Sequence, residues 1–135
     1  MDLTEDQVYA RLGEEGFARL VRAFYAQVPG DSILGSMYPP HDLAGAEERL
    51  RDFLIGRFGG PQRYIEQRGH PRLRMRHMPF AIDQAARDRW VQLMDGALDD
   101  AVTDSDVREL LRQFLHGMAT FMINRAPGIR FAPSP

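Results

Sequence analysis

Apolar residues recur along this chain at the three- and four-residue spacing of one helix face, and short stretches rich in glycine and proline interrupt them. Thr4 and Gln7 have the spacing of a capping box, which predicts that a short helix begins there. Gly13 and Gly16 mark its expected end. The pattern also predicts four longer helices, with apolar faces over 17–28, 46–58, 86–98 and 107–122.

The segments between these apolar faces contain two kinds of signal, N-cap residues that begin helices and glycine- and proline-rich loops. Asp42 and Asp83 each precede a helix, and aspartate is a favoured N-cap residue. Residues 30–41 and 61–81 are expected to be irregular loops, apart from a short helix that begins after Pro71. A loop as long as the second one is usually functional. Because no β-hairpin signal is present, the sequence predicts an all-α fold.

Length and composition bound the class of protein. The chain has 135 residues, 44% hydrophobic and 27% charged, which suits one globular domain. We expect this domain over 1–126, followed by a flexible, proline-rich C-terminal tail over 127–135. A net charge of −2 argues against a general nucleic-acid binder that would use the basic loop 68–76.

Three absences narrow the chemistry further. The chain contains no cysteine, so disulfides, thiolate zinc sites and cysteine nucleophiles are excluded. No apolar run approaches the length of a membrane span, and the acidic N-terminus is unlike a signal peptide. These features fit a cytoplasmic location.

His77 is the strongest candidate for chemistry. Pro71 suits a first helical turn, Leu73 and His77 share one helix face, and Pro79 forces the chain out of the helix. A short rigid helix of this kind presents one imidazole inward, as the axial ligand of a haem iron requires. The alternative is a solvated basic turn without a ligand.

Tyr25, Tyr38 and Trp90 are candidate donors for a small ligand. Tyr25 and Trp90 lie on apolar helix faces, and Tyr38 lies in a proline-rich loop. Buried phenol and indole groups need hydrogen-bond partners, and they would stabilise a gas ligand that carries partial negative charge. Each of the three could instead only fill core space.

Basic and polar residues near these candidates could hold two carboxylates of a cofactor. The planar guanidinium group of arginine binds a carboxylate through two hydrogen bonds. Solvent exposure is the alternative fate of such residues. The candidates are Arg49, Tyr64, Arg74 and Arg76.

Several separated motifs, in this order, resemble those of the group II truncated haemoglobins. They cover roughly residues 8–125 and comprise 24–28, 42–50, 59–61, 67–77 and Trp90. The resemblance implies a two-over-two helical sandwich around haem b. The chain departs from the family in its first turn, where a lone Gly13 replaces a typical glycine pair.

The resemblance also implies roles for individual residues. His77 corresponds to the proximal iron ligand, whereas Tyr25, Tyr38 and Trp90 correspond to distal residues that stabilise the bound ligand. Ala46 occupies the place of the distal histidine of larger globins, which leaves a ligand access route open. The remaining expected cofactor contacts are Arg49, Leu50, Phe53, Tyr64, Leu73, Arg76 and Met94.

The expected function is binding of O2, and of CO or NO, at a five-coordinate or water-ligated iron. The same site would support NO dioxygenase chemistry or peroxidase-like chemistry on peroxide, and an unidentified separate reductase would supply the electrons. A homodimer is a possible assembly state. The alternative from another class is a helical ligand- or protein-binding module without haem. His77 discriminates between the two, because a haem-free bundle has no need for an inward imidazole.

Overall fold

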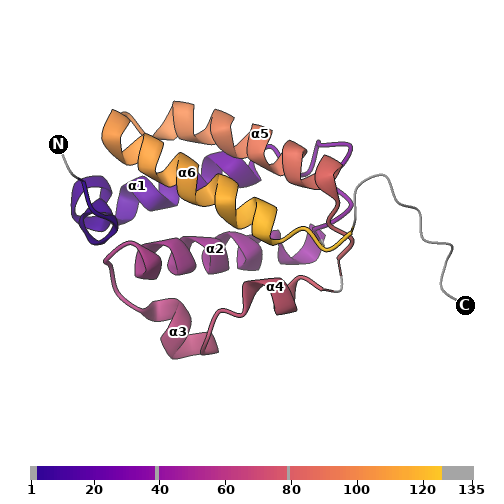
Figure 1. Ribbon diagram of the computed structural model, residues 1–135, viewed down its shortest axis with the longest axis horizontal. Coiled ribbons are helices and arrows are strands. Elements are labelled where there is room, and N and C mark those ends of the chain that lie inside the picture. The colour runs from indigo at the N-terminus through magenta and orange to yellow at the C-terminus, as the bar shows by residue number, and fades with distance from the viewer. Residues whose placement is uncertain (1–2, 39, 79, 126–135) are drawn as a thin grey trace, which may run out of the picture.

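The structure, a computed structural model, describes residues 3–38, 40–78 and 80–125, and every regular element in this part is a helix (Figure 1). The expected tail over 127–135 lies outside this part. The sequence-based prediction of an all-α chain is therefore confirmed for the described residues. None of their helices is both long and apolar enough to cross a membrane. The elements are η1 (Glu5–Gln7), α1 (Val8–Tyr25), η2 (Pro40–Asp42), α2 (Leu43–Arg57), α3 (Arg63–Arg68), α4 (Leu73–Arg76), α5 (Gln84–Ala101) and α6 (Ser105–Phe121).

Helix α1 contains the break that the sequence predicted. Gly13 has φ 78° and ψ 165°, a conformation that only glycine adopts without strain, and it kinks the helix there. The capping box of Thr4 and Gln7 is present, but it begins the 3-10 turn η1. Gly16 lies inside the second helical segment and does not end a helix.

Both predicted N-cap residues, Asp42 and Asp83, precede their helices, but only one of them makes a capping hydrogen bond. The Asp83 carboxylate accepts the Ala86 N–H and begins α5, as predicted. Asp104 likewise accepts two backbone N–H groups at the start of α6. Asp42 is the N-cap residue of α2, as predicted, but its side chain makes no capping hydrogen bond. Its carboxylate accepts a hydrogen bond from the Arg49 guanidinium instead, at 2.7 Å.

The loop predicted over 61–81 is more regular than expected. It contains α3, which the sequence analysis missed, and α4, the short helix after Pro71 that it predicted. A six-residue helix shows less than two periods of any apolar pattern, so α3 leaves little signal in the sequence.

Two pairs of helices make the body of the molecule (Figure 1). Helix α1 packs on α2, α5 packs on α6, and α1 also contacts α5, so that α1 joins the two pairs. The main core lies at these contacts, where each large apolar side chain contributes about 1.5–3 kcal/mol on burial. Its fully buried members include Phe17, Phe24, Phe58, Met94 and Leu111.

Gly59 fixes the turn that leaves α2. It has φ 99°, and a β-carbon at this position would collide with the backbone of Asp6 in η1. The turn therefore needs glycine both for its backbone conformation and for the close approach of another chain segment.

We predict that Gly59→Ala lowers the free energy of unfolding by about 1–3 kcal/mol, because it forces strain at a positive φ and a backbone clash. Chemical denaturation monitored by circular dichroism measures this loss. The matched control is Gly117→Ala in α6, where an added β-carbon meets nothing within 4 Å. That control should be stabilising by about 0.5–1 kcal/mol. Equal effects of the two substitutions would contradict the role of Gly59.

Candidate functional site

A cavity of 560 Å³ opens between the helices, within the size range of pockets that hold cofactors and other small molecules. Its walls are mostly apolar and come from α1, α2, α5, α6 and the connections between them. Every site residue expected from the sequence lines the cavity except Met94 and Arg74, and the side chain of Arg74 lies outside the described residues. The lining residues are Tyr25, Leu34, Met37, Tyr38, Asp42, Ala46, Arg49, Leu50, Phe53, Tyr64, Arg68, Leu73, Arg76, His77, Phe80, Ile82, Ala86, Arg87, Trp90, Met118, Ala119 and Met122.

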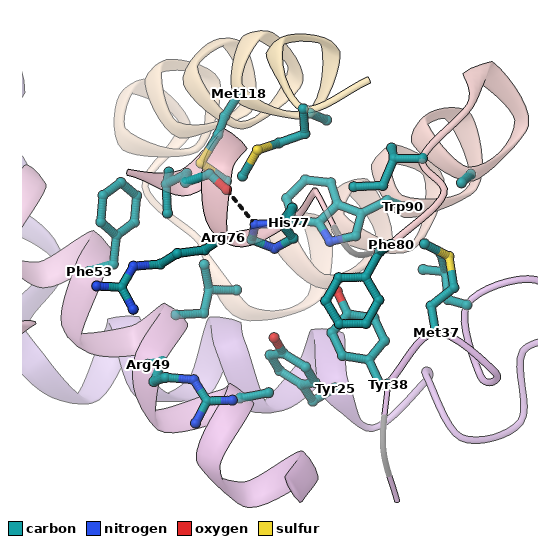
Figure 2. Close-up of a pocket in the computed structure, with 18 of the residues that line it drawn as sticks. Tyr25, Met37, Tyr38, Arg49, Phe53, Arg76, His77, Phe80, Trp90 and Met118 are labelled. Carbon is teal, nitrogen blue, oxygen red and sulfur yellow. Dashed lines mark hydrogen bonds between the residues drawn. The ribbon is translucent and has the colours of Figure 1, made fainter. Parts of the chain in front are cut away.

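The imidazole of His77 is oriented by a backbone group. Its Nδ1 lies 2.7 Å from the Leu73 carbonyl oxygen, one helical turn earlier (Figure 2). A carbonyl oxygen can only accept, so Nδ1 carries the proton in this bond. In the neutral ring Nε2 is then unprotonated, with a lone pair available to a metal.

Three polar aromatic residues, Tyr25, Tyr38 and Trp90, line the same cavity as His77. In Figure 2 the Tyr25 hydroxyl points into the space across from the imidazole, and Tyr38 lies beside Tyr25. Trp90 is connected to them by a hydrogen bond to Tyr38. The rings of Tyr25 and Tyr38 meet edge to face, with centroids 5.6 Å apart. Phe24, the neighbour of Tyr25, packs at 5.2 Å from Trp90 and holds that indole against α1.

The three groups form a directed hydrogen-bond network. The Tyr25 hydroxyl donates to the Tyr38 oxygen, and so does the Trp90 indole N–H, which can only donate. When the Tyr38 oxygen accepts both bonds, its own O–H proton is the one that this residue can still donate. The network converges on one hydroxyl group.

Burial keeps these phenols protonated. Burial, and then the nearby Tyr38, raise the pKa of Tyr25 far above its ordinary value. Burial also raises the pKa of Tyr38, although the bonds it accepts from Trp90 and Tyr25 oppose the shift. Both residues therefore stay hydrogen-bond donors beyond the pH at which an exposed tyrosine ionises.

Cationic groups gather on one side of the cavity. Arg49 and Arg76 lie together there, next to Phe53 (Figure 2). The Arg76 guanidinium donates to the Pro71 carbonyl at 2.9 Å and to the Arg68 carbonyl at 3.0 Å, which fixes its position. The side chain of Arg74 lies outside the described residues.

The ring of Tyr64 completes this side of the cavity. It lies 6.0 Å from the guanidinium carbons of both Arg68 and Arg76. This side therefore offers positive charge and planar donors to carboxylates.

Asp31 organises the loop that carries Tyr38, and the sequence analysis missed it. Its buried carboxylate accepts the N–H groups of Ile33 and Leu34 and pairs with the Arg89 guanidinium. The hydrogen bond from Leu34 contributes most to holding the pKa of Asp31 below its usual range. Because Arg89 precedes Trp90, this carboxylate connects the loop of Tyr38 to the helix of Trp90.

The apolar residues predicted to contact a cofactor lie in two places, most of them in the cavity wall and one in the main core. Ala46, Leu50, Phe53 and Leu73 line the cavity, as expected. Met94 is fully buried in the main core and does not line the cavity. Helical periodicity shows that a residue points inward, but not toward which interior space. For the same reason the sequence did not predict other residues of the cavity wall, among them Met37, Ile82, Met118, Ala119 and Met122.

The donor set fits a haem rather than a bare metal ion. Among the described residues no group of three histidine, aspartate or glutamate side chains is placed to hold an ion. His77 offers a single nitrogen to an apolar cavity with cations at one side. The His77 nitrogen would serve as an axial ligand of the iron, the apolar walls would pack against the porphyrin ring, and the cations would pair with its carboxylates.

Comparison with known proteins agrees with this geometry. The family model for bacterial-like globins matches residues 7–124. Group 2 truncated haemoglobin YjbI of Bacillus subtilis (strain 168) is 36% identical over 117 residues, which cover 87% of this chain and 88% of that protein.

Solved structures confirm the fold. A thermostable haemoglobin from the actinobacterium Thermobifida fusca is 47% identical, with a TM-score of 0.83, over 87% of this chain and 96% of that one. A truncated oxygen-avid haemoglobin from Bacillus subtilis is 36% identical, with a TM-score of 0.82, over 87% of this chain and 98% of the other. The helical sandwich, the family match and the cavity lead to one conclusion: the chain belongs to the bacterial-like globins, within the group II truncated haemoglobins, whose haem binds small ligands.

Proposed function

We propose that this globin binds haem b through His77 and retains O2, or a similarly polar diatomic ligand, beneath Tyr38. One observation carries the proposal: His77, with a free Nε2, lies across one cavity from the Tyr25 hydroxyl, which belongs to a hydrogen-bond network with Tyr38 and Trp90. A helical binding module without haem would need neither of these arrangements.

Each side of the cavity has a separate task in this proposal. When bound, haem supplies an iron that coordinates a gas molecule and exchanges electrons. His77 holds it by Nε2, while the Leu73 carbonyl fixes the ring orientation. Arg49, Tyr64 and Arg76 bind the haem carboxylates. The apolar wall of Ala46, Leu50 and Phe53 excludes water from the ring.

The polar network retains the ligand. The Tyr38 O–H donates to an atom that gathers negative charge, while Tyr25 and Trp90 polarise that hydroxyl by donating to its oxygen. Retention of this kind agrees with the similarity to an oxygen-avid haemoglobin. It suits redox chemistry better than rapid reversible storage.

We assign two reactions to the retained ligand. Oxidation of nitric oxide follows NO + O2 + e⁻ → NO3⁻, and a separate reductase supplies the electron. Peroxide reduction would use the same donors to polarise an O–O bond, with electrons from the same source. Both reactions need the donor network, so they share its tests.

The first test is the visible absorption spectrum. We expect the purified protein to show a strong Soret band that shifts when carbon monoxide is added to the reduced form. His77→Gly should release haem on the order of a hundredfold faster. Loss of a residue that only hydrogen-bonds to a metal ligand already weakens metal binding by up to about a hundredfold, and His77 is the ligand itself. Added imidazole should restore binding.

The control is His116→Ala, because that histidine binds Asp95 between α5 and α6. It should leave the spectrum unchanged. Retention of haem by His77→Gly, without imidazole, would contradict the ligand role of His77.

The second test is the rate of oxygen dissociation measured by stopped flow. Tyr38→Phe should raise this rate roughly tenfold to a hundredfold, since a hydrogen bond to a charged group contributes about 1.5–3 kcal/mol. Tyr25→Phe and Trp90→Phe should have smaller effects, because both act through Tyr38. Tyr9→Phe removes a hydroxyl that binds Glu14 and serves as the control. An unchanged rate in Tyr38→Phe would rule out donation by Tyr38.

The third test is the pH dependence of the same rate. The pKa values of Tyr25 and Tyr38 are raised, so both phenols remain protonated at a pH where an ordinary tyrosine is half ionised. We therefore expect a flat dissociation rate from neutral pH to about pH 10, the ordinary tyrosine pKa. A rise centred near that pH would show that the donors ionise normally.

A further inference from the structure

The segment that carries His77 has little regular structure of its own. Helix α4 has only four residues, and the chain leaves it at His77. Within the described residues the segment continues through Met78 and Phe80 to Ile82, before α5 begins. An axial ligand needs a fixed position, so contacts from outside this segment matter.

Asn124, just beyond the end of α6, supplies such contacts. Its side-chain NH2 group donates to the Phe80 carbonyl at 2.9 Å and to the His77 carbonyl at 3.3 Å. Its side-chain oxygen accepts the Ile82 N–H at 2.8 Å. The backbone N–H groups of Asn124 and Arg125 both donate to the Ile82 carbonyl, at 2.9 and 3.0 Å. The two segments are thus joined by five hydrogen bonds.

We infer that Asn124 is a positioning residue that fixes His77 relative to α6 and the cavity wall. The inference rests on the proposed role of His77 as the haem ligand. Asn124 does not line the cavity, and it acts through its hydrogen bonds to the backbone of His77, Phe80 and Ile82.

The chemistry of this contact calls for a side-chain amide. The site presents two carbonyl acceptors and one N–H donor, and an amide offers both donors and an acceptor on one planar group. A carboxylate would keep the Ile82 bond but would turn an acceptor toward two carbonyls. Asn124 is the only asparagine in the chain.

The placement also couples His77 to the apolar wall. Helix α6, which ends near Asn124, carries Met118 and Ala119 into the cavity, and its C-cap residue Met122 also lines it. Met122 packs with Ile82 in a small apolar cluster next to these bonds. A shift of the Asn124 contact therefore moves the imidazole relative to the surface against which haem would lie.

The test compares reduced, ligand-free holoprotein carrying Asn124→Ala or Asn124→Asp. The readouts are the iron–imidazole stretching band in resonance Raman spectra and the rate of haem transfer to apomyoglobin. Both variants should displace or broaden the band and release haem about tenfold faster or more, as expected when an outer partner of a metal ligand is lost. Asn124→Asp keeps the Ile82 bond and the shape of the side chain, so it provides a second variant, and circular dichroism checks the folding of both.

Gln27→Ala is the matched control. The Gln27 amide also donates to two backbone carbonyls, those of Ala23 and Leu93, but it joins α1 to α5. Its loss should lower thermal stability to a similar degree and leave the band unmoved. A shift of equal size in Gln27→Ala would reduce Asn124 to a general stabilising contact and overturn the inference.

The two proposals fail in different ways. A band that is present but unmoved in folded Asn124 variants, with unchanged haem release, would overturn the positioning role alone. Absence of any iron–imidazole band in the unmodified holoprotein would contradict the ligand role of His77, and the inference about Asn124 with it.

Discussion

The contact between Phe24 of α1 and Trp90 of α5 is the junction on which the rest of the structure depends. Helix α1 packs on both α2 and α5, so it joins the two helix pairs. Phe24 is fully buried at this junction, and the next residue, Tyr25, turns into the cavity. Neighbouring residues on one helix thus seal the core and supply the site. Loss of packing at this junction would therefore destabilise the fold and also displace the Tyr25 hydroxyl.

The cavity also depends on connecting segments, because Tyr38 and His77 do not lie on long helices. Each of these segments is tied to a long helix by one buried or half-buried polar side chain. Asp31 joins the Tyr38 loop to Arg89 of α5, and Asn124 joins the His77 segment to the end of α6. Backbone groups in irregular segments lack helical partners, and a side chain that satisfies several of them fixes the segment at once.

The sequence alone predicted the long helices and singled out most of the candidate residues that the structure places in one cavity. Periodicity located α1, α2, α5 and α6, and the proline-bounded turn identified His77. It did not predict α3, which is too short to show a period, or the bond of Asp42 to Arg49 in place of a cap. It also misplaced Met94, because periodicity does not separate core from cavity. The Asp31–Arg89 pair spans 58 residues of sequence, and such a contact leaves no local pattern.

The convergence of two donors on the Tyr38 oxygen has a consequence for selectivity under the proposed function. A single fixed proton lowers the free energy of a ligand that gathers negative charge, and it does little for one that stays nearly non-polar, such as carbon monoxide. A hydrogen bond of about 1.5–3 kcal/mol corresponds to roughly a tenfold to hundredfold preference between two such ligands. Gases of nearly equal size would therefore partition by their polarity, and not by the volume of the cavity.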